Sequence, residues 1–286
     1  MIQGTGQTVM AGVTGSDEES LLLRAGGPAR LRVMSYNIRA GLGAESPWEN
    51  LHLNRLDLEP VAEVIAAEAP DLVALQEIVV LEIGGRVADE AAFLAEQLGM
   101  YYSFGLVRDF PVIQQGKHVG NGLWGNAVLS RFPITSTSTY ALSNIEGCEP
   151  RSLLEARVDC AGRLLSFFSA HLSFRPVETV CQAREVAACA LPAMAAGDVI
   201  LAGDFNCRAG SEPFAVLRAS FQDSFSLWGA PLEDPCRHSF PYGHQRIKDL
   251  DHVFLSPRLS VAGSWVRVDE TGASDHNPVV TDVSFH

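Results

Sequence analysis

Six short polar segments follow apolar, strand-like runs along the chain. They are Tyr36-Asn37, Gln76-Glu77, Ala170-His171-Leu172, Gly203-Asp204-Phe205-Asn206, Leu250-Asp251-His252 and Ser274-Asp275-His276. Carboxylate, amide and imidazole groups of this kind can bind a hard cation, deprotonate a water or donate hydrogen bonds to an anion. Because catalytic groups concentrate where strands end in loops, the set as a whole is a candidate site.

Each segment taken alone has an ordinary structural explanation. An Asn or Asp at the end of a strand is most often a turn former, and a lone His is usually structural or at the surface. The spacing of Asp204 and Asn206 argues for more, because positions i and i+2 of an extended chain face the same side. Asp251 shares its face with Val253 and Leu255, so its carboxylate either needs a buried partner or ends its strand at a site.

The elements that would position these groups alternate between strand and helix. The sequence predicts helices over residues 56–69, where Pro70 ends the element, 88–98 and 177–196. It predicts strands over residues 31–36, 71–77, 101–107, 127–129, 153–158, 164–172, 199–202, 253–255 and 279–283. This order indicates an α/β protein whose sheets pack face to face under covering helices.

A single catalytic domain is predicted over residues 30–286, because no internal repeat or linker interrupts them. Residues 1–29 are rich in glycine and polar residues at first, and we expect a flexible N-terminal arm there.

Composition restricts the classes of function. The 286 residues are 47% hydrophobic, and 34 Asp and Glu against 21 Lys and Arg give a formal net charge of −13. This balance argues against a broad basic surface for nucleic acid, although it allows one small cationic pocket. There is no apolar run long enough for a transmembrane segment and no visible secretory signal, and six cysteines without CxxC spacing favour reduced thiols. A cytoplasmic protein is the resulting expectation.

Taken in order, the motifs resemble those of the endonuclease/exonuclease/phosphatase superfamily of metal-dependent phosphoesterases. The match runs from Arg32 over nearly the whole chain and also includes Gly125-Asn126-Ala127-Val128-Leu129-Ser130-Arg131. One such pattern is weak evidence, but six in the family's order are specific. The resemblance implies a four-layer α-β-β-α sandwich of two packed mixed sheets flanked by helices, with the site at one edge of the sheets.

The resemblance also implies a metal site. Glu77 is expected to be the principal ligand of a divalent cation, with Asn37 and Asp275 completing or supporting the site. The donor types agree, because carboxylate and amide oxygens suit Mg²⁺ or Mn²⁺ better than zinc.

For catalysis, the resemblance implies that Asp204 orients or deprotonates the attacking water and that Asn206 donates a hydrogen bond to the phosphate. His276 and His171 are expected to contact phosphate oxygens, with Asp251 fixing the tautomer of His276. Chemical reasoning agrees, since a metal and two imidazoles would supply positive charge and an Asp behind a His favours the charged imidazole. The predicted reaction is hydrolysis of a phosphate ester by in-line attack of water, without a covalent protein nucleophile.

The substrate stays open between three hypotheses. The segment Tyr36-Asn37-Ile38-Arg39-Ala40-Gly41 lacks the acidic residue that abasic-site nucleases usually have two positions after this Asn, so it resembles the branch of phosphatases and small-molecule phosphodiesterases more closely. A small-molecule or lipid-linked phosphoester is therefore the preferred substrate. A DNA or RNA nuclease is the alternative, and a non-catalytic binding module is the third hypothesis. Monoester or diester specificity and oligomeric state are left open.

Two further groups of residues could line a substrate pocket. A local cationic patch could form from three basic residues, although solvated charges are the preferred interpretation: Arg151, Arg246 and Lys248. Stacking on a ring could involve three tryptophans, for which core packing is preferred: Trp48, Trp124 and Trp228.

Overall fold

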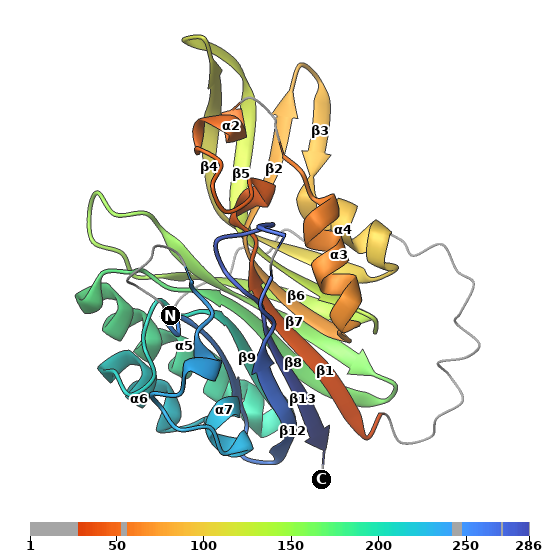
Figure 1. The fold of residues 1–286 in the computed structure, drawn as a ribbon, viewed down its shortest axis with the longest axis vertical. Coiled ribbons are helices and arrows are strands. Elements are labelled where there is room, and N and C mark those ends of the chain that lie inside the picture. Colours follow the sequence, from red (N-terminus) through yellow and green to blue (C-terminus); the bar gives the residue numbers. More distant parts are fainter. Residues whose placement is uncertain (1–27, 53–55, 242–247, 270, 286) are drawn as a thin grey trace.

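The computed structural model describes residues 28–52, 56–241, 248–269 and 271–285. The arm predicted at residues 1–29 lies outside the described residues except for its last two positions. The described chain forms two sheets packed face to face, with helices on both outer faces (Figure 1). This confirms the predicted four-layer α-β-β-α sandwich.

The first sheet contains seven strands within the described residues. They are β1 (Arg30–Asn37), β2 (Leu72–Ile83), β3 (Arg86–Asp89), β4 (Tyr101–Gln114), β5 (Lys117–Ser130), β12 (Leu259–Val266) and β13 (Val279–Phe285). Their order is β12-β13-β1-β2-β5-β4, with β3 paired to β2. β1 and β2 run parallel, and their other neighbours in the sheet pair antiparallel.

The second sheet contains six strands in the described part of the chain. They are β6 (Ile134–Leu142), β7 (Arg151–Cys160), β8 (Arg163–His171), β9 (Asp198–Asp204), β10 (Gln222–Asp223) and β11 (Asp251–Leu255). Their order is β10-β11-β9-β8-β7-β6, and β8 and β9 form the parallel pair. Each sheet therefore carries one parallel pair near its middle.

Helices cover the outer faces of the sheets. α3 (Glu59–Glu68) and α4 (Glu90–Leu98) pack on the first sheet, and α5 (Pro176–Ala196) and α6 (Glu212–Arg218) pack on the second (Figure 1). The shorter elements are η1 (Arg39–Gly41), α2 (Glu49–His52), α7 (Ser224–Trp228) and η2 (Pro235–Arg237). No helix among the described residues is long and apolar enough to cross a membrane.

The buried apolar residues form separate layers, because successive side chains of a strand point to opposite faces of its sheet. Val33 and Leu72 of the first sheet meet Phe167 and Ile200 of the second in a buried cluster between the sheets. Alternate residues of the same strands point outward and pack under the helices. Burial on both faces explains why these strands are apolar along most of their length and turn polar only at their ends.

The strand pairing brings the polar ends together. Asn37 at the end of β1 pairs in register beside Gln76 of β2, and His171 at the end of β8 lies opposite Asp204 at the end of β9. Asp251, the first residue of β11, lies opposite Asp204 on the other side. Parallel neighbours finish at the same edge, so residues distant in sequence meet at one end of the sandwich.

Three strands of the first sheet are longer than the sequence predicts. β2, β4 and β5 continue past the sandwich, and with β3 and α2 they form an extension (residues 78–89, 106–124 and 49–52) that projects at the top of Figure 1. The extension has its own small core, which includes Leu51, Leu81, Val112 and Trp124. Residues 117–125 (KHVGNGLWG) alternate too weakly to predict a strand, because partners on both sides rather than local propensity hold them in the sheet.

Candidate active site

Glu77 lies at an irregularity in β2. The pairing of β2 with β5 shifts register between Leu75 and Ile78, and the backbone of Glu77 has a φ of 61°. A positive φ is unusual for a residue with a side chain, and it persists only where the surrounding structure fixes it. The bulge places the Glu77 side chain beside Asn37, whose Nδ2 donates a 3.0 Å hydrogen bond to Glu77 Oε1.

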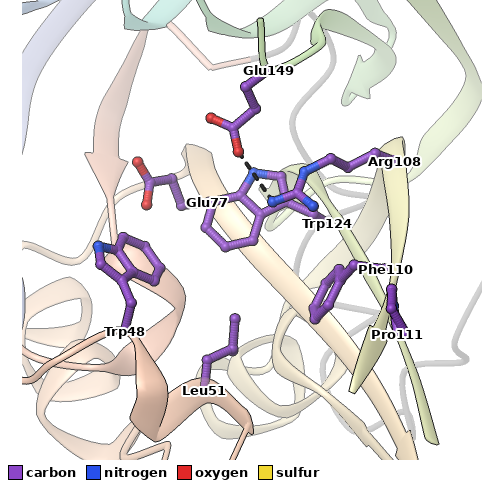
Figure 2. Close-up of a pocket in the computed structure, with 8 residues that line it drawn as sticks. All are labelled: Trp48, Leu51, Glu77, Arg108, Phe110, Pro111, Trp124 and Glu149. Carbon is purple, nitrogen blue, oxygen red and sulfur yellow. Dashed lines mark hydrogen bonds and ion pairs between the residues drawn. The ribbon is translucent and has the colours of Figure 1, made fainter. Parts of the chain in front are cut away.

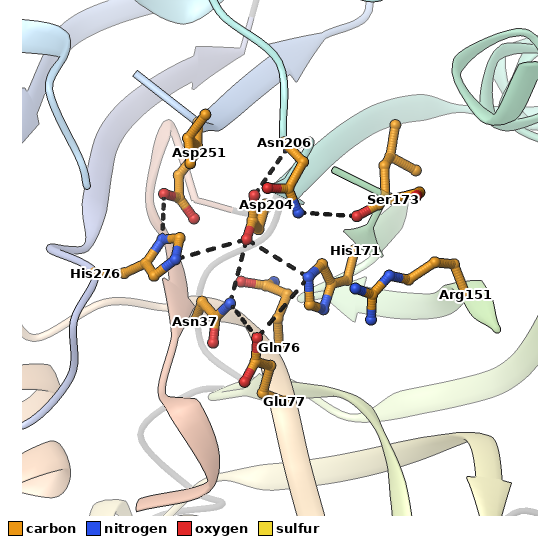
Figure 3. A network of polar contacts seen from close by, with 12 residues as sticks. Asn37, Gln76, Glu77, Arg151, His171, Ser173, Asp204, Asn206, Asp251 and His276 are labelled. Carbon is orange, nitrogen blue, oxygen red and sulfur yellow. Dashed lines mark hydrogen bonds and ion pairs between the residues drawn. The ribbon is translucent and has the colours of Figure 1, made fainter. Parts of the chain in front are cut away.

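Asp204 is the centre of the polar network (Figure 3). Its Oδ2 accepts a 3.2 Å hydrogen bond from Asn37 Nδ2 and lies 3.6 Å from His171 Nε2 and 3.8 Å from His276 Nε2. Its Oδ1 accepts a 2.9 Å bond from the backbone N–H of Asn206. Four of the eight predicted site residues thus converge on this one carboxylate.

The environment of Asp204 suits a general base. Its side chain is only 3% exposed. Burial, reinforced by the nearby negative charge of Asp251, raises the pKa of Asp204 to about 7. A base that titrates near neutral pH can both take up a proton and release it during turnover.

His276 is held as a cation by two carboxylates. Its Nδ1 lies 2.8 Å from Asp251 Oδ2, and the same Asp251 oxygen accepts a 2.6 Å bond from Ser239 Oγ. Burial opposes protonation of His276, but the charges of Asp251 and Asp204 outweigh it and raise its pKa to about 10. Nε2 of this imidazolium therefore carries a proton and points toward Asp204.

His171 is in the opposite charge state. It is buried, and burial together with the positive charges of Arg151 and His276 holds its pKa well below the ordinary value. The expectation that two imidazoles supply positive charge therefore holds for His276 only. Arg151 supplies the second charge instead, because it is 6% exposed and lies beside His171 in Figure 3. The prediction that Arg151 is a solvated charge is wrong, and Arg246 lies outside the described residues.

Asn206 closes the opposite side of the network. It follows β9 with a φ of 48°, and its Nδ2 donates a 2.9 Å hydrogen bond to the carbonyl oxygen of Leu172. This bond fixes the amide beside His171 and leaves its second N–H available for another acceptor.

The residues at Glu77 fit a divalent cation. Glu77 Oε2 is buried and has no hydrogen-bond partner among the described residues, which is costly for a carboxylate oxygen unless a cation or water binds it. A second group, Asp204, Asp251 and His276, offers ligand atoms within 4.8 Å of one another. Asp251 Oδ1 is also buried without a partner among the described residues, but Asp251 Oδ2 already bonds to His276, whereas Glu77 borders a cavity, so Glu77 is the stronger candidate.

Asp275 lies at the margin of this candidate metal site. Its Oδ2 is 3.4 Å from Arg39 Nε, and the neighbouring Ser274 Oγ donates a 2.7 Å bond to the carbonyl oxygen of Asn37. Asp275 is thus tied to the β1 end through its neighbour and an arginine, which suits a supporting position better than direct ligation.

A cavity of about 450 Å³ opens beside Glu77 (Figure 2). Its lining comes mainly from the extension and the loop before β7: Trp48, Leu51, Glu77, Arg108, Phe110, Pro111, Trp124 and Glu149. Trp48 is 42% exposed, so core packing is the wrong interpretation for it, whereas Trp124 is buried. Arg108 and Glu149 carry no recognisable motif in the sequence, because only the tertiary pairing of the strands brings them to the site.

A two-sheet sandwich with carboxylates, imidazoles and amides at the ends of its parallel strands defines a phosphoesterase and nuclease class of fold. Residues 34–276 match the model of the Endonuclease/Exonuclease/phosphatase family, and the chain belongs to that family. Members of this family are generally hydrolytic phosphoesterases that depend on a divalent metal. A search of curated proteins finds no match.

Solved structures with the same fold come from several organisms. An endonuclease/exonuclease/phosphatase from Beutenbergia cavernae is 26% identical with a TM-score of 0.72, covering 90% of this chain and 72% of that one. A mannosyl-6-phosphatase from Bacteroides thetaiotaomicron is 21% identical (TM-score 0.61, 89% and 100% covered). D. rerio TDP2 complexed with a single-strand DNA product is 19% identical (TM-score 0.60, 90% and 100% covered).

Proposed function

We propose that this protein is a Mg²⁺- or Mn²⁺-dependent hydrolase that cleaves a small-molecule or lipid-linked phosphoester. The observation that carries the proposal is the buried Asp204 carboxylate between a neutral His171 and a positively charged His276. Beside it lies a Glu77 oxygen that has no hydrogen-bond partner in the described part of the chain. A base, donors for an anion and a cation site thus lie within one network.

Asp204 takes a proton from a water held at its Oδ2. The water oxygen forms a bond to phosphorus as the bond from phosphorus to the alcohol oxygen breaks on the opposite side, and the alcohol oxygen leaves with that electron pair and takes up a proton from solvent. His276 and the free N–H of Asn206 bind phosphate oxygens and stabilise the charge that develops on them. Asp251 bonds to Nδ1 of His276 and so holds the ring in the orientation in which Nε2 donates to the phosphate.

Glu77 and Asn37 would hold the metal, with Asp275 in support. A bound divalent ion supplies positive charge to the phosphate oxygens. Arg151 adds a fixed positive charge behind His171. The neutral His171 can therefore donate or accept a hydrogen bond without carrying a charge itself.

Charge supports a compact substrate over a nucleic acid. The fold is compatible with both, since a mannosyl-6-phosphatase and a DNA-bound TDP2 share it. The formal net charge of −13 disfavours a polyanion held over many phosphates, because such binding depends on a broad cationic surface.

The test is turnover of a substrate panel by the purified full chain. The panel contains a chromogenic phosphomonoester, a chromogenic phosphodiester, inositol phosphates, lysophospholipids and abasic-site DNA, each with Mg²⁺, Mn²⁺ or EDTA. We expect metal-dependent release of product from at least one small ester and loss of it in EDTA. Preferential cutting of the DNA would overturn the substrate class, and no hydrolysis of any ester would overturn the function.

A further inference from the structure

The cavity beside Glu77 lies where the alcohol half of the substrate must go. Asn37 Nδ2 bonds both Asp204 and Glu77, so these two carboxylates flank the position of a phosphate. Attack in line from a water at Asp204 expels the alcohol on the far side, toward Glu77. Glu77 lines the cavity, and the extension provides most of its remaining wall (Figure 2).

The lining combines aromatic faces with charged groups that form hydrogen bonds. Trp48 and Trp124 have ring centroids 5.6 Å apart at an angle of 50°, so the two rings touch and leave no parallel slot for a flat base between them. Arg108 and Glu149 border the same space. Aromatic rings beside guanidinium and carboxylate groups suit a ring with apolar C–H faces and a rim of hydroxyls.

Arginines occupy the positions at the rings of the lining that a cationic alcohol would need. Glu149 is shared by two arginines, with Arg108 Nη2 at 3.1 Å and Arg151 Nη1 at 2.9 Å, and Glu77 is a second carboxylate of the lining. Arg108 also lies 5.6 Å from the centroid of Trp124 and 5.4 Å from that of Phe110. Arginine already takes the cation sites of these rings, which a quaternary ammonium group would need.

The size and polarity of the cavity exclude a long acyl chain. A volume of about 450 Å³ falls in the range of roughly 300–1,000 Å³ typical of small-molecule pockets. The arginine and carboxylate groups would lose water without a partner if an acyl chain filled the cavity.

We propose that this cavity binds the alcohol half of the substrate and that this half is a sugar or cyclitol ring, with Trp48 and Arg108 as its specificity-determining residues. The proposal rests on the proposed function for the position of the phosphate. It adds the substrate class and the role of the extension.

The test compares substrates that share the phosphate and differ in the alcohol. The ratio of kcat/KM for glucose 6-phosphate and inositol 1-phosphate to that for methyl phosphate is measured in the wild type, Trp48→Ala and Arg108→Gln. Loss of one stacking contact should lower this ratio roughly tenfold in Trp48→Ala, mainly through KM. Trp228→Ala, an exposed tryptophan in a separate pocket, is the matched control and should leave the ratio unchanged.

A binding measurement separates failure of this proposal from failure of the proposed function. Glucose 6-phosphate is titrated in EDTA while the fluorescence of the four tryptophans is followed. Saturable quenching that Trp48→Ala weakens supports the ring subsite even without hydrolysis. An unchanged ratio in Trp48→Ala, or a preference for nucleotides or lysophospholipids, would overturn the subsite while leaving hydrolysis in place.

Discussion

Asp204 is the residue on which the proposed chemistry depends most. It is buried among His171, His276 and Asn37, yet its Oδ2 is the atom on which all three converge. Asn37 Nδ2 and the backbone N–H of Asn206 bond to Asp204 at 3.2 and 2.9 Å, whereas the two imidazole nitrogens lie at 3.6 and 3.8 Å, beyond ordinary hydrogen-bond distance. The spacing leaves the imidazoles available to a bound phosphate.

Replacing Asp204 with its amide tests this role. Asp204→Asn keeps the shape but removes the base, so we expect kcat to fall by about 10² to 10⁴ with the melting temperature nearly unchanged. Asp198→Asn, at the other end of β9, is the matched control. Equal rate losses in both variants, or unfolding of Asp204→Asn alone, would assign Asp204 a structural role.

At this scale the sequence predicted the convergence of Asn37, Asp204 and His276, because each follows a recognisable strand within a recognisable order of motifs. It predicted a positive charge on both imidazoles, which is wrong for His171. His171 and His276 look alike in sequence, and only the burial of Arg151 beside one and Asp251 beside the other makes them differ.

The bulge in β2 is the element that gives Glu77 its unusual position, and α4 supports it. Glu90, the first residue of α4, is 1% exposed and accepts a 2.8 Å hydrogen bond from the backbone N–H of Val79, just past the bulge. Burial raises the pKa of Glu90 well above its ordinary value of 4.5.

This burial makes stability depend on pH in a defined direction. The stability that Glu90 contributes is fully present below pH 4.5 and declines as the pH rises, because the unfolded chain ionises Glu90 at a lower pH than the folded chain does. Glu90→Gln removes this dependence. As the pH rises, the free energy of unfolding of Glu90→Gln should therefore increase relative to that of the wild type by up to roughly 1.4 kcal/mol per pH unit.

Urea unfolding of both proteins at pH 5 and pH 8 measures this difference. Glu96→Gln, at an exposed position of the same helix, is the control and should follow the wild type. A constant difference between Glu90→Gln and the wild type at the two pH values would mean that Glu90 is ionised in the folded protein.

The helices α3, α4 and α5 and the central strands were predictable, since burial on one stripe or on both faces leaves a clear apolar pattern, whereas the shorter helices α2, α6 and α7 were not predicted. β6 and β12 were not predicted. β6 (ITSTSTYAL) is an edge strand rich in hydroxyl side chains, and Gly263 interrupts the pattern of β12 at a shift in its register. The sequence also did not predict the extension. Pairing with partner strands defines its length, and local alternation of apolar and polar residues does not.

The whole molecule joins two similar halves. Each sheet has one parallel pair, and the ends of the two pairs meet to place Asn37 and Glu77 from one sheet against His171 and Asp204 from the other. Neither sheet alone holds both the candidate metal ligands and the base. We therefore expect hydrolysis to require the intact sandwich.

The net negative charge of the chain affects which substrates the whole molecule attracts. A metal pocket and its supporting acids account for part of the −13, while the arginines Arg39, Arg108 and Arg151 are concentrated around the cavity and the site. An acidic molecule with a local cationic wall attracts a compact anion and repels a long one.

The central claim is that Glu77 makes phosphoester hydrolysis depend on a divalent metal. The most direct test is the rate of hydrolysis against Mg²⁺ concentration for the wild type, Glu77→Gln and Glu82→Gln, where Glu82 is an exposed residue of the same strand. We predict saturable activation by Mg²⁺ in the wild type and in Glu82→Gln, and a loss of about 10² or more in Glu77→Gln at every concentration. Equal activation of Glu77→Gln and the wild type would contradict the claim.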